Sequence, residues 1–194
     1  MDKPAQIALL IDADNATASR IDVILGELSR LGETNVRRAY GNWKSPNLKP
    51  WEATLHAYAI RPIQQFAYSK GKNASDMAMV IDAMDLLYTH SVDAFAIVSS
   101  DADFTPLVMR ILTDGVKVYG FGEKKTPEPF VNACSQFTYV ERLIQPSAKP
   151  EDPASASKTA TVSAEPLGEE SRLSTRKRVQ ALWKGAGVLA SPKP

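Results

Sequence analysis

The chain has 194 residues, of which 44% are hydrophobic and 23% charged, with one cysteine and a formal net charge of +1. These values are typical of one globular domain with a tail, and they exclude a wholly disordered chain, a disulfide scaffold and a cysteine-based zinc site. No apolar run approaches the roughly 18 residues of a membrane helix. The apolar stretch from Gln6 to Ile11 is too short for a signal peptide, so a cytoplasmic location without a membrane is the default expectation.

Apolar runs alternate with helical patterns from Gln6 onward. The first run, Ile7 to Ile11, is apolar throughout and ends at Asp12, which is typical of a strand buried on both faces of a parallel sheet. A helical pattern follows over 19–31, and Gly32 is predicted to close that helix. The next predicted elements are a strand at 35–40, a loop at 41–47, a helix at 51–58, a strand at 61–68 and a basic loop at 69–73.

The same alternation continues in the second half of the chain. The run from Ala94 to Val98 is again apolar throughout and again ends close to aspartates. Around it the pattern predicts helices at 75–88, 104–112 and 126–133, and further strands at 116–121 and 137–140. This strand–helix order predicts an α/β fold with a mainly parallel sheet and helices on both faces.

The composition changes at Gln145. Residues 146–170 are mostly Pro, Ala, Ser, Thr and Glu, which predicts a disordered linker. Residues 171–194 form a short basic segment that could contain one amphipathic helix but is too short to be a domain. The predicted organisation is therefore a folded domain at 1–145, a linker at 146–170 and a basic segment at 171–194.

Aspartates follow the ends of several predicted elements. Asp12 and Asp14 come after the first strand, Asp76 opens a helix, and Asp101 and Asp103 follow the fourth strand. In an open α/β sheet, ligands bind outside the carboxyl ends of the strands, where the strand order reverses. The first and fourth strands are the most apolar, so they are predicted to be central neighbours whose carboxylates converge.

Converging carboxylates repel one another and raise each other's pKa, so such a cluster requires a cation. Oxygen ligands without His or Cys favour Mg²⁺ or Mn²⁺, and such ions assist phosphodiester hydrolysis. Each aspartate also has a simpler interpretation: Asp76, Asp101 or Asp103 could merely cap a helix. Asp85 is expected on a solvated face, and the role of Asp82 is left open.

Four segments in this order resemble the NYN domain, a branch of the PIN-like nuclease superfamily, and look most similar to its bacterial LabA-like group. They are Ile7–Asn15, Tyr40–Trp43, Lys72–Asp85 and Val98–Phe104, and the similarity covers about residues 5–143. The resemblance implies a PIN-like, Rossmannoid three-layer sandwich and a metal-dependent ribonuclease. Many relatives carry a helix-turn-helix RNA-binding module after the nuclease domain; here only the linker and the short basic segment follow.

The resemblance also implies roles for individual residues. It places metal-binding and catalytic carboxylates on Asp12, Asp76, Asp101 and Asp103, with Asp14, Asn15 and Asp82 in support. RNA is the expected partner, since aromatic faces and cationic grooves bind single strands. The candidates for that contact are Trp43, Lys44, Lys70 and Lys72. In the simpler alternative, Trp43 packs locally and the lysines of the 69–73 loop are only solvated.

Two other functions remain open on sequence alone. An aspartate-nucleophile phosphatase also places Asp-x-Asp after a strand, but that chemistry usually has Thr or Val four residues after the first Asp, and here Ala16 occupies that position. A non-catalytic RNA-binding or regulatory module is the other alternative. The identity of the RNA, the mode of cleavage and the formation of a homo-oligomer are also left open.

Overall fold

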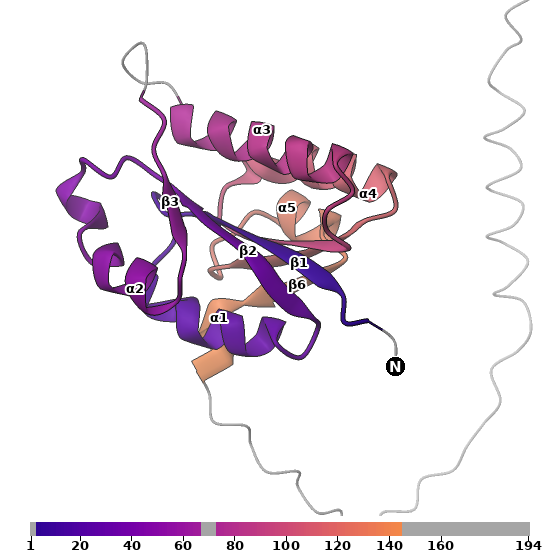
Figure 1. Ribbon diagram of the computed structural model, residues 1–194, viewed down its shortest axis with the longest axis horizontal. Coiled ribbons are helices and arrows are strands. Elements are labelled where there is room, and N and C mark those ends of the chain that lie inside the picture. The colour runs from indigo at the N-terminus through magenta and orange to yellow at the C-terminus, as the bar shows by residue number, and fades with distance from the viewer. Residues whose placement is uncertain (1–2, 67–72, 145–194) are drawn as a thin grey trace, which may run out of the picture. The chain divides into compact units, whose positions relative to one another are not determined.

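The computed structural model describes residues 3–66 and 73–144 (Figure 1). The strands are β1 Gln6–Asp12, β2 Glu33–Tyr40, β3 Arg61–Ile63, β4 Ala94–Val98, β5 Lys117–Gly122 and β6 Gln136–Tyr139. The helices are α1 Ile21–Leu28, α2 Trp51–Ala57, α3 Ala74–Tyr88, α4 Thr105–Thr113 and α5 Glu128–Ala133. None of the helices in these described residues is long and apolar enough to cross a membrane.

All six strands are parallel and lie in the order β3-β2-β1-β4-β5-β6. The chain builds the sheet outward from β1 to β3 and then crosses back to place β4 beside β1. The two most apolar strands are therefore the central neighbours, with Leu9 opposite Ala96, as the sequence predicts. The α/β fold with a parallel sheet is confirmed, and the reversal of strand order lies between β1 and β4.

Helices cover both faces of the sheet and make three layers (Figure 1). Residues Ile7, Leu9 and Ile11 of β1 pack into the core on the side of α1 and α2. Ala8 and Leu10 pack on the opposite side, with α3, α4 and α5. A strand buried on both faces needs apolar residues at every position, which explains the unbroken apolar run.

Three helices, α1, α4 and α5, begin later than the sequence predicts, and a 3-10 turn precedes the first two. The turn Ala18–Arg20 precedes α1, and the turn Ala102–Phe104 precedes α4. The predicted closing role of Gly32 is wrong, since α1 ends at Leu28. A Cβ at Gly32 would lie 2.2 Å from the carbonyl oxygen of Ala5, so this glycine allows a close approach between two backbones.

The third strand is much shorter than the predicted 61–68. Of its described residues, 61–66, only Arg61–Ile63 pair with β2. Gln64 turns its side chain toward the loop after β2, where its Oε1 accepts a hydrogen bond from the backbone N–H of Trp43 at 2.8 Å. Pro62 within β3 suits an edge strand, because it has no N–H to donate. The predicted linker and basic segment, with the basic residues of the 69–73 loop up to Lys72, lie outside the described residues.

Candidate active site

The candidate site lies at the carboxyl edge of the sheet, beside the reversal between β1 and β4. Asp12 is the last residue of β1, and Asp101 follows β4 by three positions. Asp76 approaches from the first turn of α3. Parallel strands bring these segments to the same edge although 89 positions separate Asp12 from Asp101 in the sequence.

Asp12 is almost fully buried, with 1% of its surface exposed. Its Oδ2 accepts hydrogen bonds from the Ser99 hydroxyl at 2.7 Å and from the Asn15 amide at 3.0 Å. Its Oδ1 is buried and has no hydrogen-bond partner among the described residues. Burial raises the pKa of Asp12, while the bonds from Ser99 and Asn15 oppose that rise.

Ser99 joins the two central strands at the site. While its hydroxyl donates to Asp12, its Oγ accepts a hydrogen bond from the backbone N–H of Asp101 at 3.0 Å. No role for Ser99 is predicted from the sequence. Its position in the sequence could have identified it. Ser99 is the first residue after β4, directly beside the end of β1, where its hydroxyl can reach the Asp12 carboxylate.

The pKa of Asp76 indicates that the acidic residues converge. Its pKa is raised from 3.8 to about 6, first by burial and then by the negative charge of four neighbouring carboxylates, Asp12, Asp101, Asp14 and Asp103. These five residues are called the acidic cluster from here on. Asp76 is not a capping residue, because α3 begins at Ala74 and its N-cap position is Asn73.

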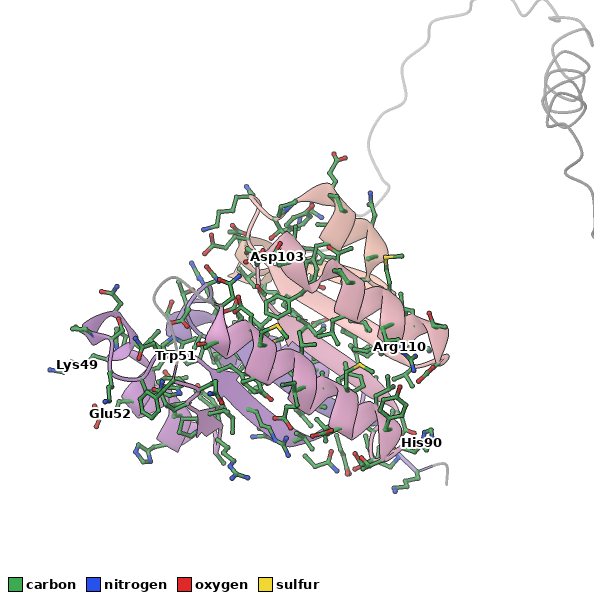
Figure 2. The ribbon with its side chains drawn as sticks, turned by 90° about the horizontal axis from the view of Figure 1, so that it is seen from above. Lys49, Trp51, Glu52, His90, Asp103 and Arg110 are labelled. Atoms are coloured by element: carbon green, nitrogen blue, oxygen red, sulfur yellow. The ribbon has the colours of Figure 1, made fainter. Side chains whose placement is uncertain are left out.

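Asp101 does serve as a cap. Its Oδ1 accepts a hydrogen bond from the backbone N–H of Asp103 at 2.9 Å at the start of the 3-10 turn before α4. That bond occupies one carboxylate oxygen of Asp101 and leaves Oδ2 for another ligand. Asp103 itself is exposed at this edge (Figure 2).

Asp14 and Asn15 lie in the turn after β1 and are both exposed. The two carboxylate oxygens of Asp14 each lie 3.3 Å from the backbone N–H of Asn42, in the loop after β2. Asn15 donates to Asp12 as described above. The turn after β1 is thereby tied both to the buried carboxylate and to the neighbouring loop.

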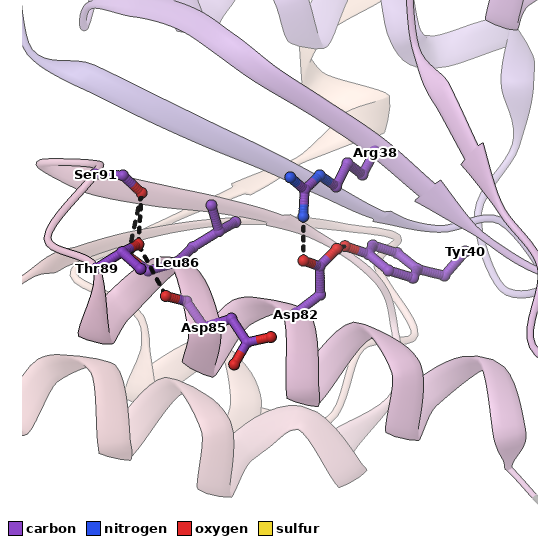
Figure 3. A network of polar contacts seen from close by, with 7 residues as sticks. All are labelled: Arg38, Tyr40, Asp82, Asp85, Leu86, Thr89 and Ser91. Atoms are coloured by element: carbon purple, nitrogen blue, oxygen red, sulfur yellow. Dashed lines mark hydrogen bonds and ion pairs between the residues drawn. The ribbon is translucent and has the colours of Figure 1, made fainter.

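Asp82 belongs to a separate network, on the side of α3 that faces strand β2 (Figure 3). It accepts hydrogen bonds from the Arg38 guanidinium and from the Tyr40 hydroxyl, both on β2. Burial, followed by the Asp82 carboxylate, raises the pKa of Tyr40. Asp82 lies six positions after Asp76, about 9 Å along the helix, so the Arg38–Asp82–Tyr40 network anchors the middle of α3 to the sheet. Asp85 is exposed, as expected.

The candidate RNA contacts differ in how firmly they are held. Trp43 is half-buried, and its indole Nε1 donates to the carbonyl of Ile63 at 2.8 Å, so it packs locally. The Lys44 ammonium lies 4.8 Å from the centre of the exposed Phe66 ring. Beside them is a hollow of about 380 Å³, lined by Trp43, Lys44, Ser45, Pro46, Leu48, Lys49, Glu52, Leu55 and Pro62. Lys70 and Lys72 lie outside the described residues.

The residues present fit a hard divalent cation. The buried, unpartnered Oδ1 of Asp12 lacks the compensation that a buried polar atom normally has. Within 3–66 and 73–144, no three His, Cys, Asp or Glu side chains are arranged to hold one ion in common. Mg²⁺ keeps several waters and is commonly bound through one or two carboxylates, so this looser arrangement suits it better than a zinc-type cage.

A family model, the NYN domain, matches residues 6–141. The chain belongs to the NYN domain family. Members of this family are generally nucleases, and the match spans every strand and helix of the described fold. In this NYN domain, the carboxylates that raise the pKa of Asp76 come from the end of β1 and from the turns after β1 and β4, the two central strands.

One protein is similar to the chain in sequence, and one solved structure is similar to it in fold. It is 30% identical over 121 residues to an uncharacterized protein of Methanocaldococcus jannaschii; this covers 60% of the chain and 47% of the relative, so the chain matches about half of that protein's length. The fold is also similar to the crystal structure of a protein of unknown function from Vibrio parahaemolyticus. That match has a TM-score of 0.60 and 20% sequence identity, and covers 72% of the chain and 94% of the other protein.

Proposed function

We propose that this NYN domain hydrolyses RNA phosphodiester bonds with the help of Mg²⁺ or Mn²⁺. The observation that carries the proposal is the unpartnered, buried Oδ1 of Asp12 at the reversal of strand order, surrounded by the other carboxylates of the acidic cluster. Because that oxygen is buried, bulk water cannot donate a hydrogen bond to it. The neighbouring negative charges strongly favour a cation over a neutral ligand.

In this proposal Asp12, Asp76, Asp101 and Asp103 would hold the metal together, one or two of them directly and the others through water bound to the ion. A divalent ion there supplies charge stabilisation at the phosphate and makes a nearby water more acidic. Ser99 and Asn15 keep Asp12 in one orientation by binding its Oδ2, which leaves Oδ1 for the ion. Asp14 supports the loop after β2, and Asp82 supports α3, which carries Asp76.

The proposed substrate is single-stranded RNA. Lys44 and Trp43 belong to the loop whose Asn42 backbone N–H contacts Asp14, and a cationic and aromatic surface this near the acidic cluster supports the proposal. Lys44→Ala should weaken RNA binding and reduce its salt slope by about one if this lysine meets a phosphate. Lys70 and Lys72 are proposed contacts on sequence alone.

Two further assignments belong to the same proposal. We assign the chain to the LabA-like branch on the four segments that resemble it. We also take the catalytic domain to end near residue 145, with a linker at 146–170 and a basic segment at 171–194 that adds positive charge for RNA. The cell location in this proposal is the cytoplasm.

Single-turnover cleavage of a single-stranded RNA, with Mg²⁺, Mn²⁺ or EDTA, tests the activity. Asp12→Asn and Asp101→Asn should each lower the rate roughly 10²–10⁴-fold, because each removes a ligand charge while keeping the side-chain shape. Asp85→Asn is the matched control: it removes an exposed carboxylate from α3 outside the acidic cluster and should cleave like the wild type.

The outcomes separate the alternatives. Equal cleavage by the wild type and both acidic-cluster variants would mean that the activity lies elsewhere or comes from a contaminant. If the wild type binds RNA but cleaves none with either metal, the domain is a binding module. Circular dichroism of each variant shows whether a lost activity reflects a lost fold.

A further inference from the structure

Helix α3 is apolar on the side that faces away from the sheet. Its inner side packs Met79, Ala83, Leu86 and Leu87 into the core, as expected of a covering helix. Its outer side presents Met77, Ile81 and Tyr88, which are 57%, 60% and 64% exposed. Met84 lies between them on the helix; it is half-buried and also packs against the core. A helix that is apolar on both sides is normally covered on both sides. These four residues are called the α3 stripe.

Helix α4 places a charged residue at the end of the α3 stripe. The Arg110 guanidinium lies 5.6 Å from the centre of the Tyr88 ring. Because a side chain of this size has an accessible area on the order of 200 Å², Met77, Ile81 and Tyr88 together expose about 360 Å². That is within the range of the largest patch on a monomer and nearly half of the ~800 Å² that each partner buries in a stable dimer.

The spacing of the α3 stripe identifies its partner. Its residues stand at positions 77, 81, 84 and 88, and the separations of four, three and four read the same in both directions. A second, antiparallel copy would therefore match apolar residues throughout: Met77 would meet Tyr88 of the partner subunit, and Ile81 would meet Met84 of the partner subunit. Such self-complementarity is the requirement of a twofold interface.

Charge favours the same antiparallel arrangement. The acidic cluster, of which Figure 2 labels Asp103, lies at the N-terminal end of α3. Arg110 lies beside Tyr88 at the C-terminal end of α3 and is ion-paired with Asp114. Antiparallel packing brings Arg110 of the partner subunit next to Met77, one position from Asp76. Parallel packing would instead place two acidic ends together. Asp85 is the one charged residue of α3 that lies next to the α3 stripe on the outer side of the helix.

We propose that this chain forms a homodimer by antiparallel packing of α3 against α3 through the α3 stripe. Sedimentation of the full chain at concentrations up to about 100 µM should show twice the 21.2 kDa mass of one chain. Ile81→Glu places two carboxylates in the centre of the interface and should raise the dimer dissociation constant at least ~100-fold. Since Ile81 is mostly exposed in the single chain, this variant should keep its fold.

Phe66→Glu is the matched control, because it introduces the same charge at a side chain of similar exposure, 56%, that is not part of α3 and contacts Lys44 instead. It should sediment as a dimer. A monomeric wild type at the highest concentration, or an Ile81→Glu variant that dimerises as well as Phe66→Glu does, would overturn the proposal; the stripe would then be covered by some other partner.

Cross-linking tests the orientation. Met77→Cys and Tyr88→Cys chains, mixed and treated with a bismaleimide of about 8 Å, the separation of packed helices, should join to each other. Burial raises the pKa of the native Cys134 thiol to about 11, so it should react slowly. Efficient cross-linking of Met77→Cys chains alone, without the mixed product, would mean parallel packing and would overturn the antiparallel arrangement.

Discussion

Two aspartates on the same helix have opposite surroundings. Asp82 meets a guanidinium and a phenol hydroxyl, so its charge is neutralised within the protein. Asp76, about two turns earlier, meets further carboxylates, and its pKa rises to about 6. One acidic residue therefore holds the helix in place, while the other leaves the protein in need of a cation. The first arrangement stabilises the fold at neutral pH, and the second destabilises it unless something binds.

The largest expected effect is that of a metal on the acidic cluster. An ion that binds only the folded state stabilises it by RT ln(1 + [L]/Kd), about 2.7 kcal/mol at 100-fold excess over Kd. Thermal unfolding should therefore occur at higher temperature in millimolar Mn²⁺ than in EDTA. Asp101→Asn should reduce this gain, and Asp85→Asn should not. An unchanged melting temperature of the wild type in both buffers would contradict a cation site in the cluster.

In the Arg38–Asp82–Tyr40 network, by contrast, removal of the carboxylate should destabilise the fold. Asp82→Ala leaves the Arg38 guanidinium and the Tyr40 hydroxyl without their acceptor in a partly buried place, and should lower the free energy of unfolding by about 1–3 kcal/mol. Urea unfolding in EDTA measures this loss. Combining Asp82→Ala with Arg38→Ala should destabilise less than the sum of the single changes; simple additivity would mean that the two side chains do not interact.

A smaller effect is expected from pH. The folded-state pKa of Asp76, about 6, lies above its ordinary value of 3.8, so the folded state binds the proton more tightly and protonation favours folding. Without metal, the contribution of Asp76 to stability should therefore fall as the pH rises from about 4 through 6 and reach its minimum above pH 7. Because the group is partly exposed, the change should be on the order of 1–2 kcal/mol.

Urea unfolding of the wild type and of Asp76→Asn in EDTA across that pH range isolates this contribution. The variant should gain stability relative to the wild type as the pH rises. A difference that is constant with pH, or that changes sign the other way, would show that Asp76 is not repelled by its neighbours.

The order of elements and the position of the acidic residues followed from local patterns. The unbroken apolar runs of β1 and β4 predicted two doubly buried strands, and the aspartates after them predicted an acidic edge. The ends of elements were less well predicted. Gly32 looked like the end of a helix, but its reason is the close approach of Ala5, a contact between segments distant in the chain.

What the sequence determined by itself is the alternation of strands and helices, because burial on both faces or on one face leaves a direct mark on the spacing of apolar residues. What only the tertiary structure decided is which polar groups meet. Ser99 bridges Asp12 and Asp101, and Asp82 binds Arg38 and Tyr40 rather than joining Asp76. These contacts depend on strand register and on the rotation of α3 about its axis, which arise from packing across the whole sheet and leave no periodic trace in the chain.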